Sequence, residues 1–287
     1  MRPSGSSPLL DRLAWLGRAA QLALEDPVEG LDRALVRLNH LPAPASAAPD
    51  PDWERQLHRM LRAAWPCPEA ARSEAIFSDA NELLRSLGLA TGRGAFGGWD
   101  DADSALARAI WCLTVHLRPQ TVVETGVARG VTSRIVLEAL RRNGSGRLWS
   151  VDRPPLDPVL HDQIGAAVPE RLRDRWTLLR GTSRRVLPGL LRRLSPVGLF
   201  VHDSLHTERN LRFELTHAWK ALGAAGALVA DDVERSGAFE RFRCEHPELE
   251  AVVAAADDGR TRFGIAVASA APRPLTLEDR GFVGRRA

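Results

Sequence analysis

Thr121-Val-Val-Glu-Thr-Gly-Val-Ala-Arg-Gly-Val-Thr-Ser133 decides the fold of this chain, together with the helical pattern behind it and then Gly146-Arg-Leu-Trp-Ser-Val-Asp152. The pattern indicates a buried strand, a glycine-bearing turn, a helix and a second strand that ends in a carboxylate. Gly126 and Gly130 lack a Cβ, so the turn can be sharp and its backbone can approach a ligand closely. In an α/β sheet, Asp152 would lie beside this turn, where a carboxylate can bind a ribose.

Strands and helices alternate after this unit. Strands are expected at Thr121–Val127, Arg147–Val151, Trp176–Arg180, Val197–Val201, Ala227–Ala230, Glu250–Ala255 and Arg262–Ala268, with helices between the first six. Only Asp257-Asp258-Gly259-Arg260 separates the last two strands, which predicts an antiparallel hairpin. The predicted fold class is therefore α/β: a Rossmann-like, mostly parallel seven-stranded sheet whose last strand is antiparallel, with an N-terminal α-helical extension.

Helical spacing also marks the N-terminal part. A helical region over residues 9–40 should break at Asp26-Pro27, because proline disfavours a helical residue before it. Residues 41–51 have linker composition, and two more helices are expected at Asp52–Ala64 and Glu69–Leu87. The side chains expected to face inward from them are Trp53, Leu57, Leu61, Ile76, Leu83 and Leu87. We predict a helical cap or dimerisation arm with a Gly-rich loop over residues 1–99, a main domain over 100–270 and a tail over 271–287. Plain packing of the arm against the main domain stays open.

Five glycines between Gly88 and Gly98 form a loop directly before the main domain, followed by Trp99-Asp100-Asp101. The loop is interpreted either as a lid over a ligand or as a flexible connection. Asp103 or Ser104 should then cap a helix that ends before Pro119.

Composition narrows the function classes. The net charge is +3 with a pI of about 9.2, and Lys220 is the sole lysine, so nearly all basic residues are arginines. The arginine pairs are spread along the chain, which argues against a nucleic-acid surface. No apolar run is long enough to cross a bilayer, and the N-terminus lacks the pattern of a secretory signal. The three cysteines, Cys67, Cys112 and Cys244, are odd in number and scattered, and we interpret them as reduced packing residues of a cytoplasmic protein.

Five ordered phrases resemble a known family. They are Val-Glu-Thr-Gly-Val-Ala-Arg-Gly-Val-Thr-Ser at 123–133, Trp-Ser-Val-Asp at 149–152, Gly-Thr-Ser with Leu-Pro-Gly-Leu-Leu at 181–191, Phe-Val-His-Asp-Ser-Leu-His-Thr at 200–207 and Gly-Ala-Leu-Val-Ala-Asp-Asp-Val at 226–233. Over residues 100–268 the chain resembles class I S-adenosylmethionine-dependent methyltransferases, and most of all the bacterial methyltransferase domain 24 family. The resemblance departs at Ala128, which replaces the middle glycine of the usual turn.

The resemblance implies a cofactor site for S-adenosylmethionine. Glu124 and Gly126 would line its methionine half, and Asp152 would accept hydrogen bonds from its ribose. Thr182 and Ser183 would lie by the adenine, with Ser183 also a candidate N-cap of its helix. The cofactor-binding residues predicted in all are Glu124, Gly126, Ala128, Gly130, Asp152, Thr182, Ser183 and Asp203.

Catalytic residues are expected where the fourth and fifth strands end. His206 can titrate near neutral pH and suits a general base, while Asp203 would orient it or bind the acceptor. Asp203, Asp231 and Asp232 could together hold one Mg²⁺ through oxygen ligands, as in some O-methyltransferases of this class. The alternative is that Asp232 caps the following helix and Asp203 hydrogen-bonds backbone.

The sequence thus favours a methyltransferase that acts on a small molecule, at a hydroxyl. A nicotinamide-dependent oxidoreductase is the enzymatic alternative, although a chain without tyrosine excludes the tyrosine–lysine mechanism of short-chain dehydrogenases. A non-catalytic cofactor-binding protein with an interaction arm is the third reading. The partners expected are a small-molecule acceptor and a second copy of the chain through the N-terminal helices, with neither membrane nor nucleic acid. Acceptor specificity is assigned to the Gly88–Asp101 loop, the N-terminal helices and Ser236–Arg243.

Overall fold

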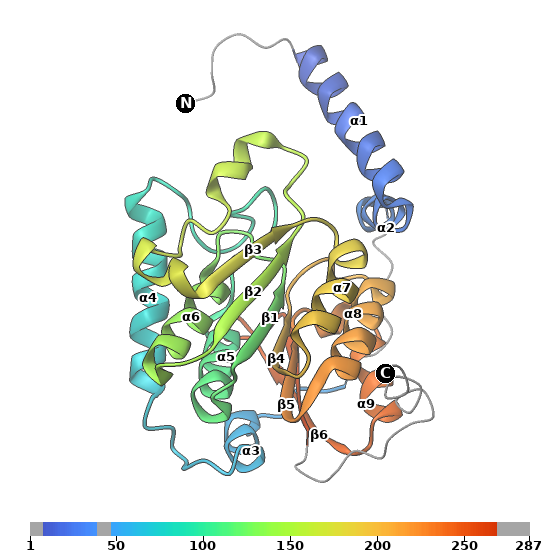
Figure 1. The fold of residues 1–287 in the computed structure, drawn as a ribbon. Coiled ribbons are helices and arrows are strands. Elements are labelled where there is room, and N and C mark those ends of the chain that lie inside the picture. Colours follow the sequence, from blue (N-terminus) through green and yellow to red (C-terminus); the bar gives the residue numbers. More distant parts are fainter. Residues whose placement is uncertain (1–7, 39–46, 269–287) are drawn as a thin grey trace, which may run out of the picture.

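A computed structural model describes residues 8–38 and 47–268 of the chain (Figure 1). Side-chain burial is described for residues 15–33 and 47–268. The predicted tail over 271–287 and part of the predicted linker lie outside the described residues.

A seven-stranded sheet forms the centre, with its strands in the order β3-β2-β1-β4-β5-β7-β6. Strands β1 to β5 run parallel to one another, and β7 runs antiparallel to both β5 and β6. The predicted fold class is confirmed, and β5 differs most from its predicted bounds because it begins earlier, at Leu222. The strands are β1 Thr121–Thr125, β2 Arg147–Asp152, β3 Trp176–Arg180, β4 Val197–His202, β5 Leu222–Ala230, β6 Leu249–Ala255 and β7 Arg262–Ala268.

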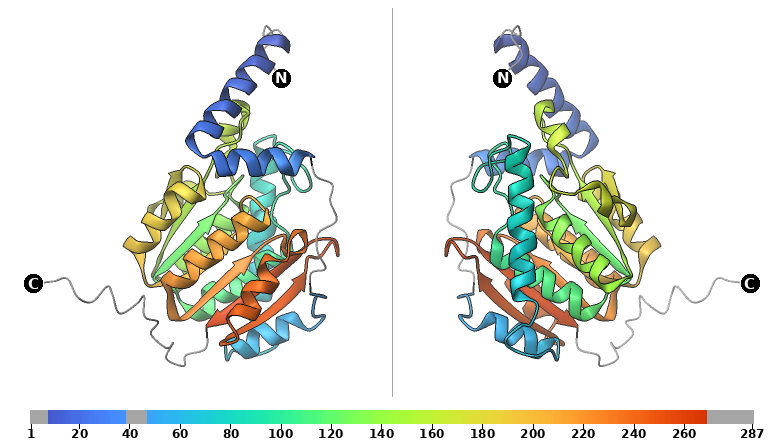
Figure 2. Two further views of the ribbon diagram at one scale, coloured as in Figure 1. Left: turned by 90° about the vertical axis from the view of Figure 1, so that its right-hand side faces the viewer. Right: turned by 90° about the vertical axis from the view of Figure 1, so that its left-hand side faces the viewer.

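Helices cover both faces of the sheet (Figures 1 and 2). On one face α5 (Ser104–Leu117) and α6 (Val131–Asn143) pack against the strands, and their buried side chains share one apolar cluster with the core of the sheet. The other face is covered by α7 (Ser183–Leu194), α8 (Glu208–Ala221) and α9 (Ala238–Glu245), which share a second cluster. Burial on both faces explains why the central strands are almost continuously apolar.

The connection between β2 and β3 corrects the expectation of a regular helix in every crossover. It contains only two short 3₁₀ helices, η1 (Pro158–Gln163) and η2 (Glu170–Arg175). Prolines at 154, 155 and 158 remove amide donors that an α-helix needs at the start of this segment. A third 3₁₀ turn, η3 (Val233–Arg235), follows β5.

The described N-terminal residues, 8–38 and 47–99, form four helices, α1 (Pro8–Glu25), α2 (Pro27–Leu38), α3 (Trp53–Met60) and α4 (Ala70–Ser86), and the predicted break at Asp26-Pro27 is confirmed. α3 and α4 pack on the α5 side of the sheet, and Trp53 and Leu57 belong to the main core. Leu84 is fully buried whereas Leu87 is 55% exposed, so the predicted inward position of Leu87 is wrong. None of the helices in the described ranges is long and apolar enough to cross a membrane.

Parallel pairing brings the ends of three strands to one edge. Thr125 pairs with Val151 on β2 and with His202 on β4, so the residues that follow these strands emerge together. In an open α/β sheet this carboxyl edge is where ligands bind. The sequence-predicted site residues all follow strands at this edge or lie at their ends.

Candidate active site at the carboxyl edge of the sheet

The turn after β1 is fixed by contacts with its own chain. Gly126 has φ +81°, and a Cβ there would lie 1.8 Å from the carbonyl oxygen of Asp203, so no other residue fits. Ala128 adopts φ +47°, the left-handed conformation that a glycine would take at this position. The close approach predicted for Gly126 is therefore to the backbone that follows β4, which passes directly over the turn.

Gly130, φ +81°, meets the chain in the same way, because a Cβ would come within 2.9 Å of the Cα of Gly165. Gly130 is also the N-cap of α6, so the turn leads straight into that helix. The absence of a Cβ at both glycines thus lets the β1 turn pack closely against the segment after β4 and the segment between β2 and β3.

Glu124 lies fully buried beneath this turn at the end of β1. Ser133 and Ser150 donate hydrogen bonds to its Oε2 at 2.7 and 2.6 Å. Burial nevertheless raises the pKa of the Glu124 carboxyl to about 7, and the two serine hydroxyls only partly offset it. Its Oε1 has no hydrogen-bond partner among the described residues, so it is available to a ligand.

Asp152, at the end of β2, lies directly beside the turn as predicted. The Val127 amide donates to its Oδ1 at 3.2 Å, while Oδ2 is buried and lacks a hydrogen-bond partner in the described part of the chain. Burial raises the pKa of Asp152, against the lowering effect of that amide and of Arg33. A buried carboxylate oxygen without a partner is costly, which favours a hydrogen-bonding ligand at this position.

Thr182 and Ser183 lie after β3 at the same edge. Thr182 is the N-cap of α7, so the expectation that Ser183 caps the helix is wrong. The Thr182 hydroxyl donates to Asp26 at 2.6 Å, from the junction of α1 and α2. Ser183 lies in the first turn of α7 and hydrogen-bonds Glu214. The helical N-terminal segment therefore contacts the edge where the predicted adenine-side residues lie.

A second buried glutamate, Glu214 of α8, was not found by sequence reasoning. His202 Nδ1 lies 2.6 Å from its Oε2, and Ser204 and Asn210 donate to its Oε1 at 2.8 and 3.0 Å. Although burial alone would raise it, the His202 ring and hydrogen bonds from Ser183 and Thr125 lower the pKa of Glu214 to about 2. The signal in the sequence is a charged residue on the apolar face of α8, which also carries Leu211, Leu215 and Ala218.

His206 lies beside this network, close to the ends of β4 and β5. Its ring packs edge-on against His202, with centroids 5.6 Å apart, and its Nε2 is 3.5 Å from Asp232 and 3.9 Å from Asp203. Burial, followed by the charges of His202 and Arg235, holds the pKa of His206 well below its usual value. The imidazole is therefore neutral at neutral pH and able to accept a proton.

Carboxylates crowd the same corner. Burial, and then repulsion by Asp231 and Asp232, raises the pKa of Asp203 well above its usual range, and the pKa of Asp231 is raised in the same way. Donor atoms of Asp203, His206 and Asp231 all lie within 4.8 Å of one another. Asp232, the third predicted metal ligand, instead forms an ion pair with Arg235, whose Nε lies 2.8 Å from Asp232 Oδ2.

The Gly88–Asp101 loop lies against this corner. The Trp99 ring faces His206 with centroids 6.4 Å apart, and Phe96 of the same loop is buried. Arg129, from the turn after β1, donates to the carbonyls of Ala90 and Ala95 and pairs with the buried Asp101. The arginine next to Ala128 therefore ties the loop to the turn, a role that spacing alone did not reveal.

The α1–α2 hairpin also covers part of the edge (Figure 2). Asp32 binds Arg209 and Thr207 at the start of α8, and Arg18 donates to the carbonyl of Leu156 at 2.5 Å. With the bond from Thr182 to Asp26, these contacts join the hairpin to three different segments of the edge.

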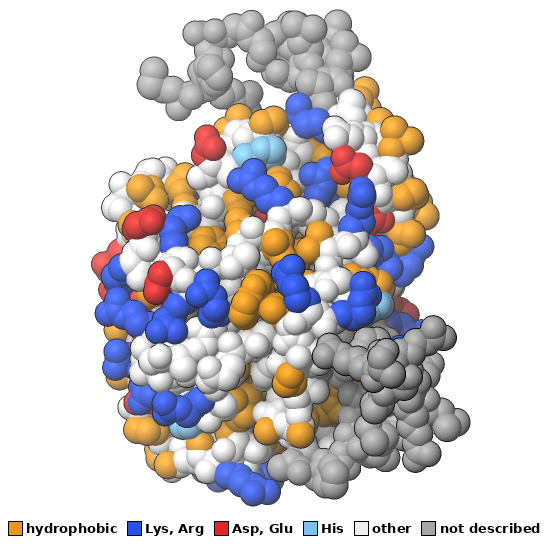
Figure 3. All heavy atoms as spheres, in the orientation of Figure 1, with side chains coloured by type: hydrophobic (Ala, Val, Ile, Leu, Met, Phe, Trp, Pro, Cys, Tyr) orange, Lys and Arg blue, Asp and Glu red, His pale blue; other side chains and the backbone are white. Residues whose placement is uncertain are grey.

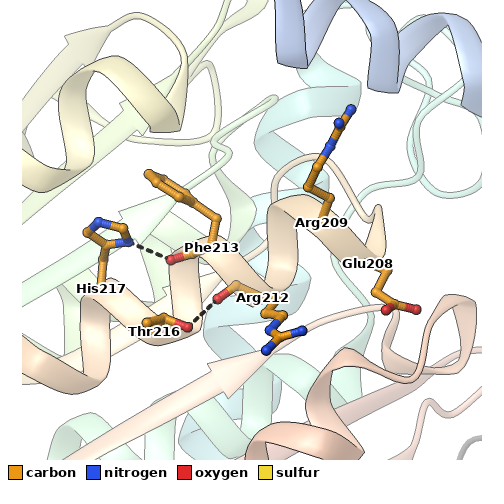
Figure 4. A pocket seen from close by; sticks show the side chains of 6 residues that line it. All are labelled: Glu208, Arg209, Arg212, Phe213, Thr216 and His217. Atoms are coloured by element: carbon orange, nitrogen blue, oxygen red, sulfur yellow. Dashed lines mark hydrogen bonds between the residues drawn. The ribbon is translucent and has the colours of Figure 1, made fainter.

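The outer surface is different in character. Arginine and lysine side chains are spread across the face in Figure 3, with apolar and neutral side chains between them. A hollow of about 510 Å³ lies on the outer side of α8, lined by Glu208, Arg209, Arg212, Phe213, Thr216 and His217 (Figure 4). It contains none of the predicted site residues.

The strand order and the antiparallel β7 are those of a class I methyltransferase fold, and the turn-and-acid pair lies at the carboxyl edge of its sheet. A dinucleotide-binding sheet with the strand order 3-2-1-4-5-6 would instead have its sixth strand next to the fifth, where this chain has the antiparallel β7. Residues 123–233 match the family described as a methyltransferase domain (Methyltransf_24), which confirms the predicted resemblance.

Two solved structures illustrate the shared fold. The O-methyltransferase from Bacillus cereus, in complex with SAH, is 15% identical with a TM-score of 0.51, over 68% of this chain and 91% of that one. The O-methyltransferase TomG from Streptomyces achromogenes, involved in tomaymycin synthesis and in complex with SAM, is 16% identical with a TM-score of 0.53, over 68% and 89%. A search of curated proteins by sequence found no match.

Proposed function

We propose that this protein transfers a methyl group from S-adenosylmethionine to a hydroxyl of a small-molecule acceptor. The observation that carries the proposal is the buried, unpartnered Oδ2 of Asp152 beside the Gly126 turn, one strand away from the imidazole-and-carboxylate corner. The strand that carries Asp152, β2, and the strand that leads to the corner, β4, flank β1, so a bound cofactor can span the β1 turn between them.

The residues present fit the cofactor. Asp152 can accept from ribose hydroxyls through Oδ2, and the Glu124 Oε1 gives a second free acceptor next to the turn. Glu124 protonates near neutral pH, so it can also donate a hydrogen bond. S-adenosylmethionine supplies an already activated methyl group, so the protein has to bind, orient and remove one proton.

We assign to His206 the role of the general base that accepts the proton of the acceptor hydroxyl. It is neutral, and its Nε2 lies 3.5 Å from Asp232 and 3.9 Å from Asp203, carboxyl groups whose oxygens would accept a hydrogen bond from the imidazolium that forms when the acceptor hydroxyl loses its proton. The Trp99 ring lies 6.4 Å from the His206 ring, and we assign it the exclusion of water from this corner. The network of Glu214 and His202 fixes the chain beneath it.

A divalent cation fits the same corner. Asp203 and Asp231 have crowded carboxylates with raised pKa values, and an Mg²⁺ ion held by them would relieve their repulsion. Asp232 would join them only after release from Arg235. When bound, the ion would add positive charge that lowers the pKa of an acceptor hydroxyl.

The covering segments are assigned the choice of acceptor. The α1–α2 hairpin binds its own chain at Thr182, Thr207 and Leu156, which favours a cap over a dimerisation arm. The Gly88–Asp101 loop contacts His206 through Trp99. Of the two interpretations of this loop, a lid over a ligand or a flexible connection, we therefore propose the lid. The boundary at residue 99, self-association and the cytoplasmic location stay predictions.

Calorimetry with S-adenosylmethionine and separately with NADH tests the function. We expect binding of the first and not of the second, and release of S-adenosylhomocysteine when the protein is incubated with a library of hydroxylated small molecules. Binding of NADH alone would overturn the methyltransferase assignment. Repeating turnover with EDTA and then with added Mg²⁺ decides the metal: unchanged activity would remove the ion from the mechanism.

A further inference from the structure

Two cysteines and two histidines gather on the opposite side of the protein's core from α7 and α8. Cys112 and His116 are one turn apart on α5, while His58 lies in the last turn of α3 and Cys67 lies in the segment between α3 and α4. The three thiols of the chain are free, but only Cys244 lies exposed and apart. Cys67 and Cys112 are 45 residues apart in sequence, so their proximity is a product of the fold.

The distances match a tetrahedral zinc site. The Sγ atoms of Cys67 and Cys112 are 3.5 Å apart, and the Nε2 of His58 is 3.8 Å from Cys112 Sγ. Zinc bonds of about 2.3 Å to sulfur and about 2.0–2.1 Å to nitrogen, at tetrahedral angles, require separations of about 3.8 and about 3.6 Å. A disulfide would instead bring the sulfurs to about 2.05 Å. Donor atoms of His58, Cys67 and Cys112 all lie within 4.8 Å of one another.

The histidine is prepared as a ligand. His58 is 1% exposed, and its Nδ1 lies 2.8 Å from the carbonyl oxygen of Glu54. That carbonyl can only accept, so Nδ1 carries the proton and the lone pair of Nε2 points to the thiols. A hydrogen bond from the second ring nitrogen to a backbone carbonyl is the usual support of a metal-binding histidine.

His116 stands next to these three groups. Its ring packs edge-on against His58 with centroids 5.7 Å apart, and it is among the groups that surround the Cys67 thiol. Its Nε2 is buried and has no hydrogen-bond partner in the described parts of the chain. A cavity of about 10 Å³, lined by His58, Cys67 and Cys112 among others, leaves room for about one small particle.

We infer that His58, Cys67 and Cys112 bind one Zn²⁺ ion, with His116 completing the coordination. Two sulfur and two nitrogen donors in a tetrahedral arrangement select zinc among the common biological cations. The ion would clip α3 and the segment after it to α5, and so fix the helical layer on this face of the sheet. The site shares no residue with the proposed cofactor site.

The test begins with the full chain purified under reducing conditions without chelator. Elemental analysis should give one zinc per chain for the wild type and for Cys244→Ser, the matched control with an exposed thiol. Cys67→Ser, the more accessible of the two proposed thiolate ligands, should retain less than a tenth of an equivalent. Titrating metal-free protein with Zn²⁺ against a competing chelator should show Cys67→Ser binding more than about 100-fold more weakly, beyond the loss caused by removing a group that merely supports a ligand.

The spectrum of the wild type with Co²⁺ provides a readout that does not depend on the stability of a variant. The metal-free wild type with Co²⁺ should show tetrahedral visible bands and a sulfur-to-metal charge-transfer band, and His116→Ala should change the visible bands while keeping the charge-transfer band. Zinc-free protein in which three thiols titrate and no Zn²⁺ binds would overturn the inference. So would a non-reduced protein in which a single thiol titrates, because Cys67 and Cys112 would then form a disulfide.

Discussion

Two buried glutamates under the same sheet edge have pKa values shifted in opposite directions. Glu124, below the β1 turn, has two serine donors and a pKa of about 7, whereas Glu214, below the end of β4, has the His202 ring and several donors and a pKa of about 2. Both are fully buried, so burial does not separate them. The number and charge of their partners decide which carboxyl ionises.

The difference divides the edge into two halves. The Glu124 half, with Asp152, keeps unpartnered acceptor oxygens, which is what a binding site needs. The Glu214 half is internally satisfied on its carboxylate and supports His206, which is what a fixed catalytic group needs. We therefore expect mutations in the first half to change cofactor affinity and mutations in the second to change turnover or stability.

His206→Ala is the largest expected effect and the sharpest break of the comparison. Turnover should fall about 10²–10⁴-fold because the acceptor loses its base, while cofactor affinity stays nearly constant. Single-turnover rates and calorimetry measure the two quantities. His161→Ala, in η1, serves as a control histidine at a part-buried position. Full activity of His206→Ala would move the proton-accepting role to Asp203 or to a metal-bound group.

Glu214→Ala should cost about 3–5 kcal/mol of unfolding free energy, because it leaves the buried His202 without its charged partner. Chemical denaturation at pH 7 measures the loss. The control is Glu245→Ala, whose ion pair with Arg212 is exposed on both sides and worth at most about 1 kcal/mol. A loss below 1 kcal/mol for Glu214→Ala would mean that the network of Glu214 and His202 does not stabilise this half of the edge.

The contribution of Glu124 to the free energy of unfolding should decrease as pH rises. Its folded pKa is raised from 4.5 to about 7, so the folded protein keeps a proton that the unfolded chain has released over this range. Stability relative to Glu124→Gln should therefore fall as pH rises from about 4.5 to 7, by about 3 kcal/mol at about 1.4 kcal/mol per pKa unit. Glu82→Gln, at an exposed site on α4, should show no such trend. A wild-type-minus-Gln difference that stays flat from pH 5 to 8 would contradict the raised pKa.

Asp152→Ala should weaken S-adenosylmethionine binding by about 1–3 kcal/mol, since the ribose hydroxyls would lose their acceptor. Asp152→Asn is the informative companion, because it keeps the size of the side chain but replaces one acceptor by a donor. Calorimetry gives both affinities, and turnover at saturating cofactor should change little. Unchanged affinity in both variants would remove Asp152 from the cofactor site.

The sequence predicted the first half better than the second, for a physical reason. Glu124, Gly126 and Asp152 belong to one contiguous strand–turn–helix–strand unit, whose geometry is set locally by glycine conformations and parallel pairing. Glu214 and Trp99 reach the site from a distant helix and loop, and only packing brings them there. The seven strands were predictable because apolar runs and turn residues are local signals as well.

Some outcomes depended on interactions that no spacing encodes. Arg129 carried no prediction of its own, yet it holds the Gly88–Asp101 loop through two carbonyls and Asp101. Asp232 looked like a metal ligand on the same footing as Asp231, but Arg235 three residues later pairs with it. Long side chains choose partners by three-dimensional reach, so these contacts could not be read from the sequence.

Trp99→Ala should have the smallest effect, and it tests whether the Gly88–Asp101 loop is a lid or a plain connection. Loss of an aromatic packing contact of about 0.5–1.5 kcal/mol should raise the KM for the acceptor about 2- to 12-fold. Cofactor affinity should not change, because Trp99 faces His206 in the Glu214 half and not Asp152. Trp65→Ala, another partly exposed tryptophan that lies beside His58, is the control for the loss of an indole. An acceptor KM that is the same in both variants would make the loop a plain connection, and the choice of acceptor would then fall to the α1–α2 hairpin.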